Sequence, residues 1–179
     1  MRDMETFPAK NGEEITLRPA VPGDAREILN TVNSVALERS YVLMEKYGKD
    51  EESEKLYITE MDCSNNLLLV ALAHDVVIGS LAAIQAEGGR NPQTAHVLDI
   101  GLHLIKTYRG LGVGSRMLQY AVEWAGERGF KKLEASIFTL NQRSLGLFSR
   151  AGFNEEGTRR KQYRIGNEYI DEVITGKVL

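Results

Sequence analysis

The chain has 179 residues, of which 42% are hydrophobic and 26% charged, and it suits one globular domain with a full core. The net charge of −3 argues against a nucleic-acid or membrane-surface role driven by bulk charge. Cys63 is the sole cysteine, so the sequence excludes an intramolecular disulfide and a cysteine-rich metal site, and the three histidines lack metal-ligand spacing.

Strand and helix patterns alternate along the chain. The polar residues 1–13 predict a loose lead-in, followed by a single domain over residues 14–179. Period-2 and period-3.6 hydrophobic patterns then predict the elements. Strands are expected over 15–18, 67–73, 76–86, 94–105 and 133–138, helices over 24–36, 51–61, 115–129 and 141–151, and a hairpin within 160–178. This order predicts an α/β (α+β) fold, a largely antiparallel sheet covered by helices.

A glycine-rich segment separates the strand near residue 105 from the helix that follows it. It reads Arg109-Gly110-Leu111-Gly112-Val113-Gly114, with glycines at alternate positions. Glycine permits positive φ and close approach of a ligand to the backbone, and amide groups at a helix start favour anions. The segment therefore predicts a phosphate-binding loop; the alternative is a strand-to-helix turn without a ligand.

Two familiar phosphate loops do not fit this spacing. A nucleoside-triphosphate loop needs Lys-Ser/Thr after its last glycine, but Gly114 is followed by Ser115-Arg116. A dinucleotide fingerprint needs Gly-x-Gly-x-x-Gly/Ala, and Ser115 or Met117 stands in the last place. A nucleotide-binding protein is therefore disfavoured.

The pattern Arg-x-x-Gly-x-Gly resembles the acyl-CoA pyrophosphate loop of the Gcn5-related N-acetyltransferase (GNAT) family. A second segment, from Asn141 to Phe153, resembles that family's Asn-x-x-Ala-x-x-Leu-Tyr-x-x-x-Gly-Phe, and one helix and one strand separate the two motifs. The tail after Phe153 resembles the subgroup of ribosomal-protein and small-amine acetyltransferases. The resemblance implies the acyl-CoA N-acyltransferase fold over about residues 15–178.

The resemblance also implies a set of residues that hold acetyl-CoA. The fourth strand offers backbone groups to the pantetheine arm, the glycine loop holds the pyrophosphate, and the helix from 141 contacts the pantetheine path. The residues implied are Leu102, His103, Leu104, Arg109, Gly110, Leu111, Gly112, Val113, Gly114, Asn141, Ser144 and Phe148. No metal is implied.

Two positions decide the proton chemistry that the resemblance implies. Asp99 matches the place where relatives often carry Glu, so it is the expected base, acting through a water. The alternative is a strand aspartate that bonds to neighbouring backbone or to an arginine. Phe148 stands where many relatives carry a tyrosine that protonates the departing thiolate. Water, Ser149, Tyr163 or Tyr169 are candidate substitutes, and Phe148 is otherwise expected to pack beneath the pantetheine.

The resulting prediction is a cytoplasmic acetyl-CoA-dependent N-acetyltransferase. The acceptor is expected to be the primary amine of a small amine, an amino acid or a protein N-terminus. This amine attacks the acetyl group directly in a ternary complex. The alternative is an acyl-CoA-binding sensor without turnover, motivated by Phe148. No nucleic acid or membrane partner is expected, and a homodimer is left open because dimers are common among relatives.

Overall fold

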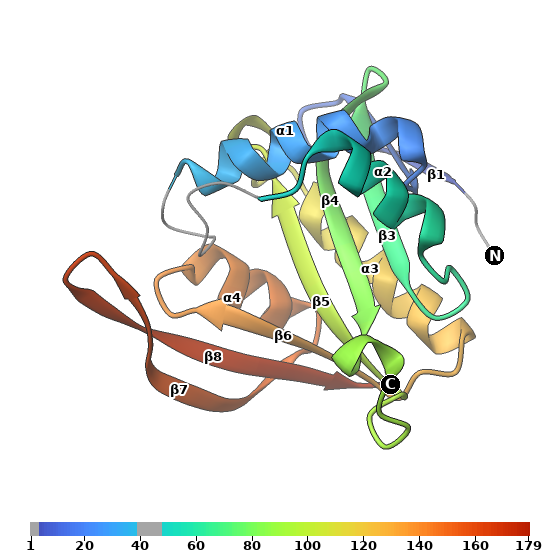
Figure 1. Ribbon diagram of the computed structural model, residues 1–179. Coiled ribbons are helices and arrows are strands. Elements are labelled where there is room, and N and C mark those ends of the chain that lie inside the picture. Colours follow the sequence, from blue (N-terminus) through green and yellow to red (C-terminus); the bar gives the residue numbers. More distant parts are fainter. Residues whose placement is uncertain (1–3, 39–47) are drawn as a thin grey trace.

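The computed structural model describes residues 4–38 and 48–179, which form a sheet with helices on both faces (Figure 1). The strands are β1 (Glu5–Pro8), β2 (Glu14–Pro19), β3 (Leu67–Ala73), β4 (Val76–Gln85), β5 (Val97–Leu104), β6 (Lys132–Phe138), β7 (Asn154–Ile165) and β8 (Glu168–Val178). The helices are α1 (Ala25–Ala36), α2 (Glu51–Glu60), α3 (Val113–Glu127) and α4 (Gln142–Arg150), with short 3-10 turns η1 (Pro22–Asp24), η2 (Ala86–Gly89) and η3 (Lys106–Tyr108).

The described strands form one sheet in the order β1-β2-β3-β4-β5-β6-β8-β7. Each neighbouring pair is antiparallel except β5 and β6, which are parallel. A parallel pair requires a crossover connection, and α3 provides it. The predicted mixed, mostly antiparallel sheet of a single α+β domain is confirmed.

Two hydrophobic clusters hold the helices against the sheet. The larger cluster joins α3 and α4 to one face, and Met117 and Leu118 of α3 are completely buried in it. The smaller cluster joins α1 and α2 to the other face through Ile28 and Ile58. In Figure 1 α1 and α2 lie in front of the sheet and α3 lies behind it. The strand faces alternate between the clusters, as the pleat requires.

The two ends of the described chain contain more strand than the sequence pattern indicated. Residues 5–8, assigned to a loose lead-in by their composition, form β1, and Phe7 of this strand pairs with Ile15 of β2. The terminal hairpin begins at Asn154 rather than near residue 160. β7 is mostly exposed and half of β1 is exposed, so backbone pairing rather than an apolar run defines both strands.

Candidate functional site

The parallel strands β5 and β6 separate part of the way along their length. They pair at three positions, the last being Asp99 opposite Glu134. Beyond it β5 continues to Leu104 and stays paired with β4, while β6 continues to Phe138 paired with β8. Figure 1 shows the two strands diverging from their common end. The β6-facing edge of β5 after Asp99 therefore has backbone groups available to pair with an extended ligand.

The glycine loop lies at the end of this gap and leads into α3. Gly110 and Gly112 have φ values of 79° and 92°, and Gly112 is the N-cap residue of α3. A Cβ added to either glycine meets no atom within 4 Å, so both face open space. Gly114 is closely packed, because its Cβ would lie 3.4 Å from Leu104 and Leu147 side chains. The loop thus presents unobstructed backbone at a helix N-terminus, which favours an anion.

A cavity of about 440 Å³ lies beside the end of β5 that no longer pairs with β6. Val35 of α1 reaches it from one side of the sheet, and Ser115 of α3 and Leu147 of α4 reach it from the other. The complete lining is Lys10, Val35, Leu102, His103, Leu104, Arg109, Gly110, Gly112, Gly114, Ser115, Asn141, Arg143, Ser144, Leu147 and Arg150. Two reactants that approach from opposite faces of the sheet would meet inside it.

Nine of the twelve residues implied for cofactor binding line this cavity. The other three do not. The Leu111 carbonyl accepts a hydrogen bond from the Lys10 N–H (3.0 Å), and Val113 is completely buried in the core. Phe148 is also in the core, where its ring meets Phe153 edge-on with centroids 4.9 Å apart. These side chains support the loop and α4 from beneath.

Asn141 and Ser144 start α4 at the edge of the cavity. Asn141 is the N-cap residue, and its Oδ1 accepts a hydrogen bond from the Ser144 N–H at 3.0 Å. This bond satisfies one of the unpaired amides of the first helical turn. The cap also holds both residues on the cavity lining, so one local hydrogen bond serves helix and site together.

The Arg109 side chain is bonded within the protein and does not point freely toward a phosphate. Its two Nη atoms donate to the Glu38 carboxylate at 2.7 and 2.6 Å, and its Nε donates to the Leu104 carbonyl at 2.8 Å. These hydrogen bonds hold the pKa of Glu38 below its usual value. The positive charge of Arg109 is therefore largely neutralised by Glu38, and the side chain joins the loop to the end of α1.

His103 lies on the α1 side of β5 as a neutral ring. Thr31 Oγ1 donates to the Ile28 carbonyl (2.8 Å), so it accepts from Nε2–H of His103 at 3.0 Å. Nδ1 is left to accept from the Ser80 hydroxyl at 3.4 Å. Burial and the positive charge of Arg109 lower the pKa of His103 to about 4. His103 therefore stays uncharged near neutral pH and ties α1, β4 and β5 together.

Asp99 and Glu134 form a pair of neighbouring carboxyl groups where the strands separate. The pKa of Asp99 is raised to about 6, mainly because the side chain is buried. The hydrogen bond with Glu134 and the negative charge of Glu134 raise it further. Lys132 Nζ lies 3.3 Å from Glu134 and 2.6 Å from Glu156, so it partly balances the acidic charge. A carboxyl group titrating near neutral pH is suited to exchange a proton with a substrate.

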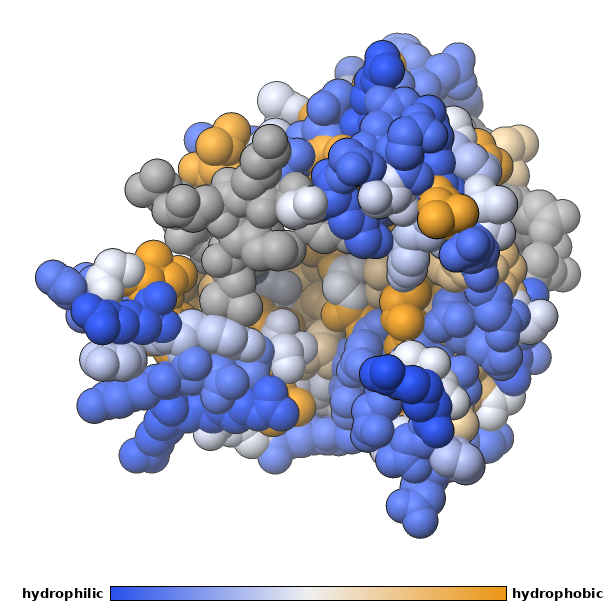
Figure 2. All heavy atoms as spheres, viewed as in Figure 1, coloured by the Kyte–Doolittle hydropathy of each residue, from blue (hydrophilic) through white to orange (hydrophobic). Residues whose placement is uncertain are grey.

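The surface beside Asp99 is open on the α1 side of the sheet. Gly101 lies between Asp99 and His103 on the same face of β5, and a Cβ added there meets no atom within 4 Å. Figure 2 shows a hollow on this face of the molecule, between the helices α1 and α2 and the β7–β8 hairpin. A second reactant therefore has a route toward Asp99 from this side.

Sequence reasoning missed several residues of the site. Lys10, Val35, Arg143 and Arg150 line the cavity. No local motif marks Lys10 or Val35, because each reaches the cavity through a contact between distant segments. Arg143 and Arg150 stand inside the second motif, and their spacing of seven residues on a helix was an available signal.

Residues 4–38 and 48–179 show neither a metal-binding cluster nor a membrane-spanning helix. This part of the chain contains no cluster of three or more His, Cys, Asp or Glu side chains suited to a metal ion. None of its helices is both long and apolar enough to span a membrane.

The chain is similar to known acetyltransferases in sequence and in fold. The sequence model described as "Acetyltransferase (GNAT) family" matches residues 36–153. The L-amino acid N-acetyltransferase AaaT of Escherichia coli (strain K12) is 25% identical over 111 residues, which cover 62% of this chain and 67% of that protein. A GNAT-family acetyltransferase from Streptococcus pneumoniae has a TM-score of 0.85 at 25% identity, covering 92% of this chain and 99% of that one. A phosphinothricin acetyltransferase from Sinorhizobium meliloti, solved with AcCoA, has a TM-score of 0.82 at 23% identity, covering 92% and 88%.

Proposed function

The chain belongs to the acetyltransferase (GNAT) family, and we propose that it transfers the acetyl group of acetyl-CoA to a primary amine by direct attack in a ternary complex. The cavity at the glycine-loop end of β5 carries this proposal, because residues from both faces of the sheet line it. The open surface at Gly101 and Asp99 lies next to it along β5. A donor bound along the loop and an acceptor on the α1 side would meet at the gap. Such an arrangement converts a bimolecular step into a nearly unimolecular one.

The residues present fit acetyl-CoA as the donor. The open backbone at Gly110 and Gly112 suits the pyrophosphate, and the β6-facing edge of β5 suits an extended pantetheine arm with amide groups. Asn141 and Ser144 lie beside the same path. Each hydrogen bond to a charged phosphate oxygen contributes about 1.5–3 kcal/mol, so several account for specific binding.

Asp99 is the proposed base for the amine. An amine with a pKa near ~10.4 is neutral in only about one molecule in 10³ at pH 7, so the site has to accept a proton before or during attack. The amine nitrogen attacks the thioester carbonyl carbon, the C–N bond forms, and the C–S bond breaks. The amine proton passes to Asp99 through a water, and the sulfur leaves as the CoA thiolate.

The departing thiolate needs no dedicated acid in this proposal. Phe148 has no proton to donate, and the Tyr163 hydroxyl donates to Glu172 at 2.8 Å. A thiol pKa near ~8.5 makes the thiolate a tolerable leaving group, and it takes its proton from water. The phenylalanine is therefore compatible with turnover, which favours an enzyme over an acyl-CoA sensor.

The named relatives and the open face of the site support a proposal for the acceptor class. The similar proteins act on L-amino acids and on phosphinothricin, and a structural neighbour with a TM-score of 0.82 is a ribosomal-protein-alanine N-acetyltransferase. These acceptors share a primary amine. We propose a free amino acid, a related small amine or a peptide N-terminus.

The test is thiol release from acetyl-CoA in the presence of an acceptor panel. The panel contains the proteinogenic amino acids, phosphinothricin, small amines and short peptides with free N-termini. Thiol release that depends on one acceptor, with the acetylated product found by mass spectrometry, supports the proposal. Binding of CoA without acceptor-dependent release across the panel would favour the sensor, and thermal stabilisation by ATP but neither CoA species would contradict both.

Glu134→Gln is expected to move the pH dependence of the reaction to lower pH. Asp99 acts as a base when ionised, so kcat/KM for the acceptor should rise as pH increases through about 6. Removing the neighbouring charge lowers the pKa of Asp99, so the midpoint should fall. The measurement is the pH profile at saturating acetyl-CoA, with one acceptor for all variants.

Glu156→Gln is the matched control for this experiment. It removes the other carboxylate bound to Lys132 and leaves the pair of Asp99 and Glu134 in place. Its midpoint should stay within about 0.3 pH units of the wild type, because an exposed charge behind a lysine is well screened. An unchanged midpoint in the Glu134 variant would mean that this pair does not control the reaction.

A further inference from the structure

Three cationic side chains from two distant parts of the chain meet at the cavity. Lys10 belongs to the turn between β1 and β2, and Arg143 and Arg150 belong to α4. The Lys10 N–H donates to the Leu111 carbonyl at 3.0 Å, which seats the N-terminal hairpin on the glycine loop. The ion pair of Arg116 with Glu5 fastens α3 to β1 nearby. We call Lys10, Arg143 and Arg150 the cationic rim.

The first turn of α4 is an electrostatically unfavourable position for Arg143. Arg143 lies in the first turn, where the helix dipole disfavours a cation, and α4 contains no acidic residue to compensate. Arg143, Leu147 and Arg150 are spaced to share one helix face, and all three line the cavity. The charge of Arg143 helps to lower the pKa of Glu38, but that carboxylate already accepts both Nη groups of Arg109. A bound anion would give Arg143 a partner of its own.

Gly146 has no side chain, which leaves room for the Arg150 side chain to run back along α4. Nη1 of Arg150 lies only 3.2 Å from the position that a Cβ on Gly146 would occupy. The guanidinium therefore folds over Gly146, toward the N-terminal end of the helix and Arg143. Glycine at this position costs helix stability, and here it admits the arginine.

The rim carries charge that is available to a ligand. Across the described residues, none of Lys10, Arg143 and Arg150 forms an ion pair, whereas Arg109 is paired with Glu38. None of the described residues that line the cavity is acidic. A chain of net charge −3 thus concentrates positive charge at one cavity. Such a concentration selects an anionic ligand of high charge.

We infer that the cationic rim binds the 3′-phosphate of CoA, separately from the glycine loop that binds the pyrophosphate. The inference rests on the proposed function, since it takes CoA as the donor. The backbone amides of the loop and the start of α3 suit the two linked phosphates. The rim adds charged donors outside the loop, and the remaining phosphate of CoA is a dianionic monoester suited to arginine.

The consequence is selection against donors that lack this phosphate. The protein should bind CoA more tightly than 3′-dephospho-CoA, which differs by the monoester alone. Several cations near a dianion are expected to give a ratio of dissociation constants of about 10 or more at low salt. The ratio should fall as salt is raised, because exposed charges are screened.

The test measures both dissociation constants by titration calorimetry for four proteins. These are the wild type, Lys10→Gln, Arg143→Gln combined with Arg150→Gln, and the triple variant. The wild-type ratio is expected to collapse toward 1 in the triple variant, with the constant for 3′-dephospho-CoA changed by less than about twofold. The side chains are exposed, so melting temperatures should stay close to the wild-type value.

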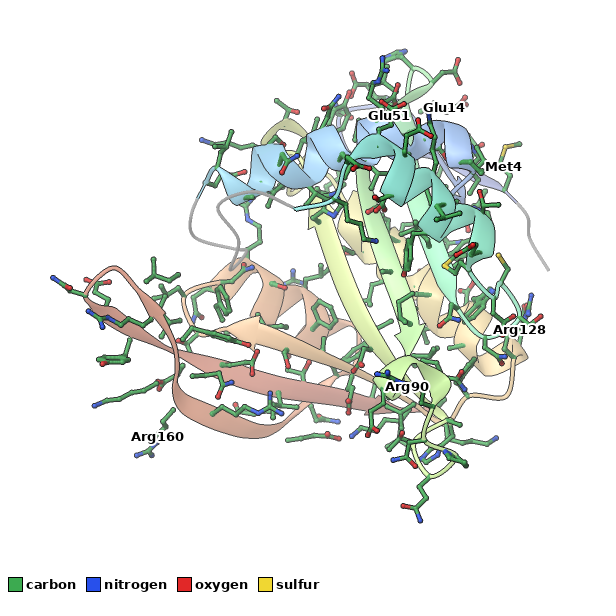
Figure 3. All side chains as sticks on the ribbon, in the orientation of Figure 1. Met4, Glu14, Glu51, Arg90, Arg128 and Arg160 are labelled. Atoms are coloured by element: carbon green, nitrogen blue, oxygen red, sulfur yellow. The ribbon has the colours of Figure 1, made fainter. Side chains whose placement is uncertain are left out.

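Arg90→Gln is the control for loss of a positive charge. Arg90 follows η2, near the lower ends of β4 and β5 in Figure 3 and away from the glycine loop. It should leave the ratio unchanged. Equal binding of the two ligands by the wild type, or an equal loss for both ligands in the variants, would overturn the rim assignment. Absence of CoA binding altogether would instead contradict the proposed function.

Discussion

Asp99→Asn is expected to lower kcat by about 10²–10⁴-fold while leaving the dissociation constant for acetyl-CoA unchanged. Asparagine keeps the shape of the side chain but does not accept the proton of the amine. Asp99 does not line the cavity, so donor binding should not depend on it. The measurements are steady-state turnover with the best acceptor and calorimetric titration with CoA.

The same substitution is expected to raise the melting temperature near pH 7.5. The pKa of Asp99 is raised from 3.8 to about 6, so the folded protein holds this proton more tightly than the unfolded chain. That stabilisation is fully present below pH ~3.8 and is lost as pH rises through about 6. Above it, the charged side chain beside Glu134 is a destabilising contact that asparagine removes. The gain in Tm should therefore shrink between pH 7.5 and pH 5.

Asp75→Asn provides the matched control. Asp75 is exposed in the β3–β4 turn with φ of 63°, a conformation that asparagine tolerates well. Turnover and Tm should both stay close to wild type. If Asp99→Asn keeps full turnover, Asp99 is not the base. If it lowers Tm at pH 7.5, Asp99 has a structural role that outweighs its charge.

Gly112→Glu is expected to weaken CoA binding by at least about 100-fold, since three effects act together. The φ of 92° strains a residue with a Cβ by roughly 1–2 kcal/mol. The added side chain projects into the open space that the loop presents to the donor. Its carboxylate repels phosphate groups in the same space. The measurement is the dissociation constant for CoA by calorimetry.

Gly129→Glu separates loss of binding from loss of stability. Gly129 follows the other end of α3, has φ of 82°, and has no atom within 4 Å of an added Cβ. Its backbone strain should therefore resemble that at Gly112, with a similar fall in Tm. CoA affinity should be retained. A Gly112 variant that binds CoA within tenfold of wild type would show that the glycine loop does not hold the donor.

Arg109 shows why a motif alone does not assign a side-chain role. The spacing Arg-x-x-Gly-x-Gly places an arginine beside a phosphate loop, and the family resemblance implies that this arginine helps to hold acetyl-CoA. The fold brings the end of α1 next to the loop, and Glu38 takes both Nη groups of Arg109. A paired arginine is a structural link between the two sides of the site. The free positive charge at the cavity lies instead on the cationic rim.

Local signals were strong where one segment determines its own conformation. Positive φ at Gly110 and Gly112, the helix start at Val113 and the Asn141 cap each depend on neighbouring residues. The element order and fold class were predictable for the same reason, because hydrophobic period reports secondary structure. The strand β1 was missed because it has only four residues, half of them exposed, and so carries little hydrophobic signal.

The sequence by itself determined the family, the fold class and most of the donor-binding segment, because these depend on short-range spacing. The tertiary structure alone decided which distant residues share the site. It placed Glu134 beside Asp99, Glu38 against Arg109, and Lys10 on the rim. Contacts of this kind depend on sheet register and on packing between segments, which no local pattern encodes. The charge state of the site follows from these contacts, and so does the chemistry proposed for it.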